Sequence, residues 1–222
     1  MKWETDLIRD IRFSNTWENN LDDYRPQFGG VSRHLSNIHN VDEDKINGTF
    51  SECNKINLLN AIQGLGDKCR CIVEIGVDRV ANGNFNTSTR AILERKLPNT
   101  IYLGIDLEDK TYIVNHQKNI HFLRTDSSET SIIIEYLNSI GIKEIDFLFI
   151  DGFHSVNQVY RDWELTKILS KHGIVAIHDT AYHPGPNLFV NNLDETKWDI
   201  IKNSCDHSKD DYGIGFIRRK HV

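Results

Sequence analysis

Two short apolar segments of this chain each run directly into side chains that bind cations or carry protons. Asp151 and His154 follow the first segment, and His178 and Asp179 close the second. Carboxylates are the usual ligands of Mg²⁺, Mn²⁺ and Ca²⁺, and imidazole extends this choice to transition metals. A histidine with its ordinary pKa of about 6.5 also takes up a proton near neutral pH. If both segments are parallel strands of one sheet, the four side chains meet at the edge where such sheets hold ligands.

The elements around these residues alternate between strand and helix. Short, nearly continuous apolar runs are typical of strands covered on both faces, and apolar residues at helical spacing lie between them. This alternation predicts an α/β fold with a mostly parallel sheet and helices on both faces. The expected strands are at 71–76, 101–106, 120–123, 147–150, 174–177 and 212–219, and the expected helices are at 54–65, from 88 to about 98, at 130–140 and at 156–169.

The composition limits the number of domains and the class of partner. The 222 residues, 39% of them hydrophobic and 26% charged, suffice for one well-filled core. We therefore expect an N-terminal arm or cap at 1–53 and one α/β domain at 54–222. The net charge of -6 comes without a basic stripe, so nucleic acid is not expected as a partner.

The location of the protein is predicted from its cysteines and apolar runs. The four cysteines include no Cys-x-x-Cys pair, and the amino terminus has none of the charged and apolar blocks of a signal peptide. We expect a reduced, cytoplasmic protein without structural disulfides. No apolar run approaches the roughly 20 residues that cross a bilayer, which argues against membrane insertion.

Three earlier strand ends carry groups that suit a nucleoside. Glu74 and Gly76 end the first strand, and the loop after them lacks the Gly-x-Gly-x-x-Gly of a dinucleotide site. Asp106 ends the second strand, where a carboxylate accepts hydrogen bonds from ribose hydroxyls. Asp126 and Ser127 follow the third strand and could hold an adenine amino group. The alternatives are an ordinary strand-end turn at Gly76 and helix caps at Asp106 and Asp126.

This order of groups, without phosphate-binding glycines, describes a pocket for a nucleoside that carries no diphosphate. In this order of strand-end groups the chain resembles the class I S-adenosylmethionine-dependent methyltransferases. The blocks 149–155 and 173–180, with Asp162 between them and Pro184-Gly185 after them, are similar to the metal-dependent O-methyltransferases of the macrocin and mycinamicin type, which modify sugars. The resemblance covers the α/β domain. It implies a Rossmann-like, doubly wound, seven-stranded sheet in the order 3-2-1-4-5-7-6, with the last strand antiparallel.

The resemblance also implies roles for the strand-end residues. Glu74 and Gly76 would face the methionine part of S-adenosylmethionine, Asp106 its ribose, and Asp126 with Ser127 its adenine. S-adenosylmethionine is therefore the expected cofactor.

The same relatives imply a divalent metal, Mg²⁺ or Mn²⁺, bound by Asp151 and Asp179. In them the residue before the second metal aspartate is acidic. Here it is His178, which is then a further metal ligand, a partner of the ligands or a core histidine. His154 matches the position of a proposed general base. The alternatives are that Asp151 caps the next helix, that Asp179 binds backbone amides and that both histidines are ordinary loop residues.

We therefore predict a metal-assisted O-methyltransferase whose acceptor is a small hydroxylated molecule such as a sugar. The two rival hypotheses are a metal-dependent hydrolase or hydroxylase that uses His154, His178 and Asp179, and a non-catalytic binding module. The acceptor would be selected by the arm, by the loop 77–86 and by the segment 182–192. The prolines at 184 and 186 predict a rigid turn there, which is either a lid over the acceptor pocket or a plain connection. The sequence leaves the oligomeric state open, and the resemblance implies that in a homo-oligomer the arm could contribute to a partner's site.

Overall fold

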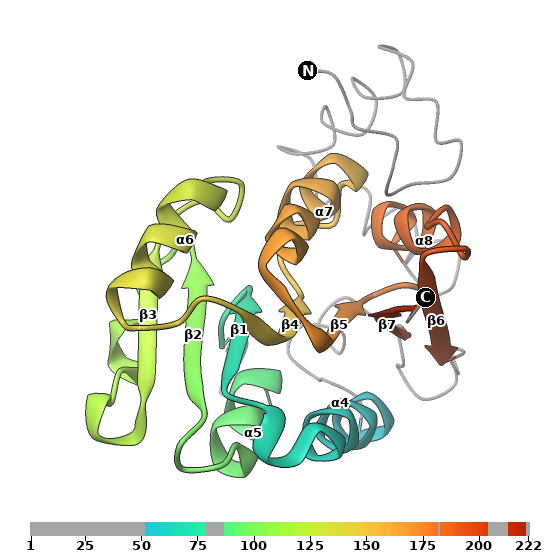
Figure 1. The fold of residues 1–222 in the computed structure, drawn as a ribbon. Coiled ribbons are helices and arrows are strands. Elements are labelled where there is room, and N and C mark those ends of the chain that lie inside the picture. Colours follow the sequence, from blue (N-terminus) through green and yellow to red (C-terminus); the bar gives the residue numbers. More distant parts are fainter. Residues whose placement is uncertain (1–51, 79–86, 182, 204–212, 221–222) are drawn as a thin grey trace.

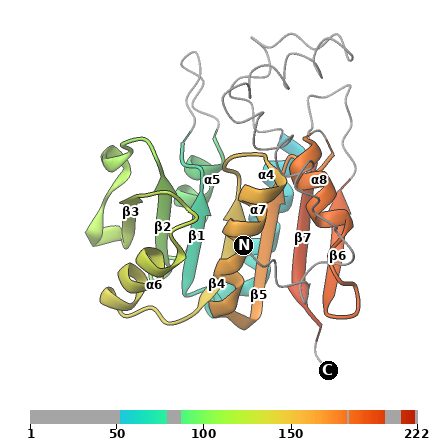
Figure 2. The same cartoon turned by 90° about the horizontal axis from the view of Figure 1, so that it is seen from above.

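A seven-stranded sheet with helices on both faces forms the centre of the computed structural model (Figures 1 and 2). The structure describes residues 52–78, 87–181, 183–203 and 213–220. The strands are β1 Cys71–Ile75, β2 Ile101–Asp106, β3 Ile120–Arg124, β4 Ile145–Ile150, β5 Leu169–His178, β6 Trp198–Asn203 and β7 Ile214–Arg219. Their order across the sheet is β3-β2-β1-β4-β5-β7-β6.

The pairing of the strands separates a parallel part of the sheet from an antiparallel edge. Strands β1 to β5 pair in parallel. Strand β7 runs antiparallel to both β5 and β6. These findings confirm the predicted fold class and strand order. Because the parallel strands all end at the same edge, the loops after Ile75, Asp106 and Ile150 meet there.

In the part of the chain that the structure describes, the α-helices form two layers. They are α4 Glu52–Leu65, α5 Ser88–Arg95, α6 Thr130–Ser139, α7 Val156–Trp163 and α8 Pro184–Asn191. Short 3₁₀ helices lie at Gly66–Lys68 (η1), Thr111–Ile113 (η2), His116–Lys118 (η3) and Glu164–Ile168 (η4). Figure 1 shows α4 and α5 on one face of the sheet and α6, α7 and α8 on the other. No helix among these is long and apolar enough to cross a membrane.

The central strands are apolar because helices cover both of their faces. Every residue of β1 and β4 is buried. Val73 packs in the cluster that contains side chains of α6 and α7, and its neighbour Ile72 packs in the cluster on the α4 side. Beside the antiparallel edge, the ring of Trp163 lies with its centroid 4.8 Å from Trp198 and 5.3 Å from Phe189. Both tryptophans are core aromatics.

Two expectations for the segment after β4 are wrong. The helix expected at 156–169 ends at Trp163, η4 follows, and Leu169 already pairs with Ile145 in the sheet. At Leu169 strand pairing is favoured over continuation of the helix. Pairing buries the Leu169 side chain, and the backbone polar groups of Leu169 find hydrogen-bond partners in the sheet. The prolines expected to form a turn begin α8 instead. Pro184 occupies the first helical position, where the missing amide hydrogen costs no hydrogen bond.

The division into an arm at 1–53 and a domain at 54–222 stays a prediction. Helix α4 begins at Glu52. Residues 1–51 lie outside the described part of the chain, as do 79–86 within the loop expected to shape the pocket.

Candidate functional site

Adjacent strand ends bring together the aspartates and histidines that the sequence singles out. Strands β4 and β5 are parallel neighbours, so Asp151 and His178 leave the sheet side by side. Helix α7 is capped by Ser155, whose hydroxyl accepts a hydrogen bond from the amide of Gln158 at 3.1 Å. The alternative that Asp151 caps this helix is therefore wrong, and its carboxylate contacts His178 instead.

The imidazole of His178 links the two carboxylates. Its Nδ1 lies 3.0 Å from Asp151 Oδ1 and 3.2 Å from Asp179 Oδ1. The ligand atoms of these three residues all lie within 4.8 Å of one another. Atoms bonded to one ion at about 2.0–2.6 Å are at most about 5 Å apart. The spacing therefore suits a single divalent cation.

Charge holds His178 and Asp179 in their ionised forms despite their burial. Burial by itself lowers the pKa of His178, but the carboxylates of Asp179 and Asp151 outweigh it and raise this pKa well above its ordinary value. Burial likewise raises the pKa of Asp179, but His178 and His154 outweigh it and bring that pKa well below its ordinary value. A divalent cation between the carboxylates would replace the positive charge that His178 supplies.

Asp179 also contacts two histidines on the side away from His178. His154 Nε2 lies 2.7 Å from Asp179 Oδ2, and His183 Nε2 lies 4.0 Å from the same oxygen. The rings of His154 and His183 are stacked, with centroids 4.1 Å apart. Asp179 has a φ of 61°, and a left-handed conformation costs a residue other than glycine about 1–3 kcal/mol. Such strain persists where the surroundings hold it, as they do in this cluster.

Asn54 of α4 is a further partner of His178. Its buried amide nitrogen lies 3.1 Å from His178 Nε2. An amide nitrogen can only donate, so in this orientation it pairs with an Nε2 that carries no proton. A doubly protonated His178 requires the amide to turn until its oxygen accepts from Nε2.

The ends of β1 and β2 form the other half of the candidate site. Gly76 has a φ of 85°, and a side chain there would collide with the carbonyl oxygen of Asp151, so only glycine lets the two loops approach. Asp106 accepts hydrogen bonds from the amides of Val77 at 2.8 Å and Glu108 at 2.9 Å. No α-helix starts directly after β2, so the helix-cap alternative for Asp106 is wrong.

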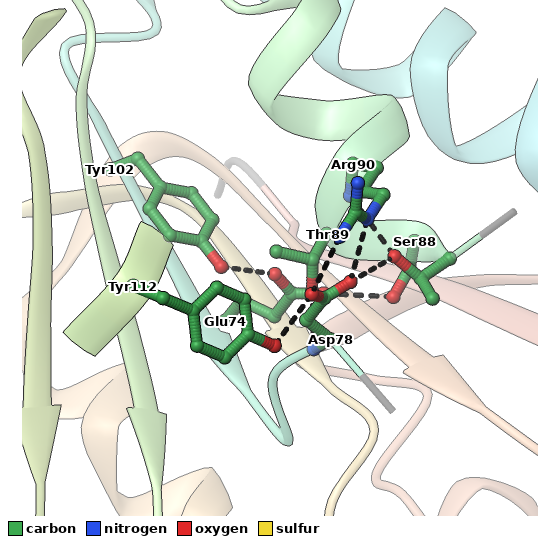
Figure 3. A network of polar contacts seen from close by, with 8 residues as sticks. Glu74, Asp78, Ser88, Thr89, Arg90, Tyr102 and Tyr112 are labelled. Atoms are coloured by element: carbon green, nitrogen blue, oxygen red, sulfur yellow. Dashed lines mark hydrogen bonds and ion pairs between the residues drawn. The ribbon is translucent and has the colours of Figure 1, made fainter. Parts of the chain in front are cut away.

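Glu74 lies within a network of buried side chains (Figure 3). Its carboxylate accepts hydrogen bonds from the Ser88 hydroxyl at 2.8 Å and from the Tyr102 hydroxyl. Burial raises the pKa of Glu74 to about 8, so the side chain is largely protonated at neutral pH. Its contact with the methionine part of a cofactor stays a prediction.

Asp78 is another centre of the network in Figure 3. Its carboxylate accepts hydrogen bonds from the hydroxyls of Thr87 and Tyr112, each at 2.7 Å, and pairs with Arg90 at 3.3 Å. These contacts tie the end of β1 to the start of α5 and to η2. The amide of Val77, the residue before Asp78, donates to the Asp106 carboxylate. The network therefore also helps to hold that carboxylate in position.

Asp126 and Ser127 follow β3 and have different partners. Asp126 accepts hydrogen bonds from the amide and hydroxyl of Ser128, at 2.9 and 2.8 Å. Helix α6 begins only at Thr130, so Asp126 is not its cap. The Ser127 hydroxyl accepts a hydrogen bond from the side-chain nitrogen of Gln158 at 2.9 Å, which ties this loop to α7.

Three residues of this region are not among those predicted from the sequence. They are Asn54, Asp78 and His183. His183 could have been predicted from its spacing of four residues from Asp179, because residues so spaced share a side of a helical turn. Asn54 stands 124 positions from His178, and no local pattern connects them.

Comparison with known proteins identifies the family. A family model described as a methyltransferase domain matches residues 58–180. The chain belongs to this methyltransferase family. The match extends from α4 to the end of β5, and it confirms the class that the strand-end residues predict.

Solved structures with the same fold include MycE, a methyltransferase of the mycinamycin biosynthetic pathway. The complex of MycE with Mg, SAH and mycinamycin VI is 14% identical to our methyltransferase, with a TM-score of 0.57 over 85% of this chain and 53% of MycE. A second MycE structure, with Mg and SAH, is 15% identical, with a TM-score of 0.55 over 85% and 54% of the two chains. The chain thus spans about half the length of MycE, and the likeness concerns the fold. No curated protein sequence matches the chain.

Proposed function

We propose that this methyltransferase transfers a methyl group from S-adenosylmethionine to a hydroxyl of a small, sugar-like acceptor, with a divalent cation at Asp151 and Asp179. The observation that carries the proposal is the 2.7 Å contact between His154 Nε2 and Asp179 Oδ2. A candidate base thus lies directly beside a candidate cation ligand. Metal-assisted deprotonation of a hydroxyl requires this arrangement.

The strand ends suit S-adenosylmethionine in their chemistry. Asp106 is half-buried, and two amides orient its carboxylate, as an acceptor for ribose hydroxyls requires. The next residue, Leu107, is 62% exposed and offers an apolar surface to a base. Asp126 and Ser127 stand at the neighbouring strand end and supply polar groups for adenine. When bound, S-adenosylmethionine supplies a methyl group on a positively charged sulfur.

The donor set at β4 and β5 suits a divalent cation. Asp151 and Asp179 offer the oxygen ligands that Mg²⁺ and Mn²⁺ prefer, and the Nδ1 of His178 shifts the preference toward Mn²⁺. The structures of MycE contain Mg. When bound, the cation lowers the pKa of an acceptor hydroxyl.

The residues of the chain orient the acceptor and accept its proton. His154 takes the proton on its imidazole ring, and the Asp179 carboxylate, 2.7 Å from Nε2, stabilises the imidazolium that forms. Asp151 and Asp179 set the position of the acceptor oxygen. In a displacement that must be in line, such positioning supplies much of the acceleration.

The acceptor class is inferred from the site and from MycE. Two carboxylates that hold one cation leave positions for a pair of neighbouring hydroxyls, which are common on sugars. MycE was solved with mycinamycin VI. The net charge of -6 opposes binding to phosphate backbones. Cytoplasmic location and assembly into a homo-oligomer stay predictions.

Calorimetric titration tests the cofactor and the cation separately. We expect S-adenosylmethionine and S-adenosylhomocysteine to bind, and Asp106→Ala to weaken this binding about tenfold or more while Mn²⁺ binding persists. Asp151→Asn should give the opposite pattern. Asp109→Ala, which removes an exposed carboxylate from the same loop, serves as the matched control. Failure of both cofactors to bind, with or without Mg²⁺ or Mn²⁺, would refute the proposal.

Methyl transfer is then followed with a labelled methyl donor and a panel of nucleoside-diphosphate sugars and glycosylated products. His154→Ala should keep the affinity for cofactor and lose about 10²–10⁴-fold in turnover, the usual contribution of a general base. Full turnover by His154→Ala would remove the base from the proposal.

A further inference from the structure

The carboxylate of Asp179 divides the cluster into two sets of possible ligands. Its Oδ1 belongs with His178 and Asp151, at the site already described. Its Oδ2 faces His154 and His183 instead. In the second set, as in the first, the three ligand atoms all lie within 4.8 Å of one another.

We propose that His154, Asp179 and His183 form a second cation site, and that this site takes a transition-metal dication such as Zn²⁺ or Co²⁺. Two imidazole nitrogens and one carboxylate oxygen are the donors that such ions select, whereas Mg²⁺ and Ca²⁺ require mostly oxygen ligands. A set of two histidines and one carboxylate also leaves coordination positions open for water. The two sites therefore differ in the ion that each prefers.

The distances are close to those of a metal centre. Zinc bonds to nitrogen and oxygen are about 2.0–2.2 Å long, so neighbouring ligand atoms on one tetrahedral ion lie about 3.3–3.6 Å apart. His154 Nε2 is 2.7 Å and His183 Nε2 is 4.0 Å from Asp179 Oδ2. Tetrahedral spacing requires the His154–Asp179 distance to lengthen and the His183–Asp179 distance to shorten, each by less than about 1 Å. The two rings, which are stacked with centroids 4.1 Å apart, would also have to tilt so that both nitrogens face the ion.

The backbone already holds the three residues in place. The amide of His183 donates to the carbonyl oxygen of Asp179 at 3.0 Å, which closes the turn between them. A side chain at Gly185 would collide with the carbonyl oxygen of His154, so the start of α8 packs directly against the His154 segment. The side chains of His154, Asp179 and His183 are only 11%, 7% and 9% exposed. An ion bound there is therefore screened from bulk water.

An ion at this site would inhibit the reaction. It would bind His154 through Nε2, and a neutral imidazole bound in this way carries its one proton on Nδ1, so neither ring nitrogen could take up the proton of the acceptor. This consequence rests on the proposed function, whereas the binding of the ion does not. We expect a methyltransferase that works with Mg²⁺ or Mn²⁺ and loses activity in the presence of Zn²⁺ or Co²⁺.

The test is direct measurement of Co²⁺ and Zn²⁺ binding to the full chain. Calorimetry and the visible absorption of Co²⁺ report stoichiometry, affinity and ligand type without an activity assay. We expect the wild type to bind Co²⁺ or Zn²⁺. His183→Ala should bind the same ion at least about tenfold more weakly, because one of three ligands is lost. His121→Ala, which removes a half-buried histidine of β3, is the control and should bind as the wild type does. His183→Gln and a thermal melt of each variant show whether folding is intact.

Two outcomes separate this inference from the proposed function. Asp151→Asn should abolish the Mg²⁺ or Mn²⁺ site and leave the His183-dependent Co²⁺ signal unchanged. If Asp151→Asn changes the affinity for no metal while the His183 variants still weaken Co²⁺ binding, the cation at Asp151 is removed from the proposed function and the second site is supported. Equal Co²⁺ and Zn²⁺ affinity in the wild type, His183→Ala and His183→Gln would overturn the second site.

Discussion

His178 Nδ1 lies 3.0 Å from the Asp151 carboxylate, across the ends of two adjacent parallel strands. The same imidazole nitrogen lies 3.2 Å from the Asp179 carboxylate, so His178 bridges the two carboxylates of the proposed cation site. This contact supplies positive charge next to the buried carboxylate of Asp179 and the half-buried carboxylate of Asp151. In the proposed cation site it would shift the preference of these carboxylates toward Mn²⁺.

Replacing that imidazole should change the metal preference. We expect His178→Glu to shift selectivity from Mn²⁺ toward Mg²⁺ by on the order of tenfold, because a third carboxylate suits the harder ion. Without metal, the variant should unfold at a lower temperature, since three carboxylates then repel one another. Titration with both ions and a thermal melt measure the two effects. An unchanged Mn²⁺/Mg²⁺ affinity ratio would show that His178 does not contribute to the cation site.

Asn54 should stabilise the protein through its contact with Nε2 of His178. Asn54→Leu leaves the buried Nε2 without the amide at 3.1 Å, and an unsatisfied buried group costs about 1–3 kcal/mol. Asn54→Asp keeps an acceptor for a protonated Nε2 and should retain most of the stability. Urea denaturation compares the two variants, and nitrogen NMR of the imidazole reports the position of its proton. Equal stability of Asn54→Leu and the wild type would exclude this role.

Glu74 should make the protein less stable as the pH rises. Its pKa in the folded state is about 8, above the ordinary value of 4.5. The folded state thus binds the proton more tightly, and the free energy of unfolding falls between about pH 4.5 and pH 8. Glu74→Gln removes this titration and should gain stability relative to the wild type across that range.

The control for this prediction is Glu74→Ala. It leaves the hydroxyls of Ser88 and Tyr102 without their acceptor and should lose about 2–4 kcal/mol. Urea denaturation at pH 5 and pH 8 provides the measurement. The same pH dependence in Glu74→Gln and the wild type would contradict the assignment.

Tyr112 should affect the cofactor side of the site through Asp78. Tyr112→Phe removes the 2.7 Å hydrogen bond to Asp78 and loosens the segment whose amide donates to Asp106. We expect S-adenosylmethionine to bind about two- to tenfold more weakly, the equivalent of one hydrogen bond. Tyr136→Phe, which removes the hydroxyl next to His121, should bind the cofactor normally. Equal affinities in the two variants would separate Tyr112 from the cofactor site.

The sequence by itself determined the layers of the fold and the residues at the strand ends. Continuous apolar runs such as Phe147–Ile150 indicate central strands clearly, because both faces of a central parallel strand are buried. Aspartates that directly follow such runs, at 106, 151 and 179, then fall at the ligand-binding edge. The weaker patterns failed where two structures were locally acceptable, as at Leu169 and Pro184.

Only the tertiary structure decided how these residues combine. It turned one oxygen of Asp179 toward His178 and the other toward His154 and His183. It also placed Asn54 of α4 against His178. Such contacts depend on strand order, register and side-chain direction, which arise from the packing of segments far apart in the chain. Local periodicity therefore predicted which residues reach the site, and packing determined which of them contact one another.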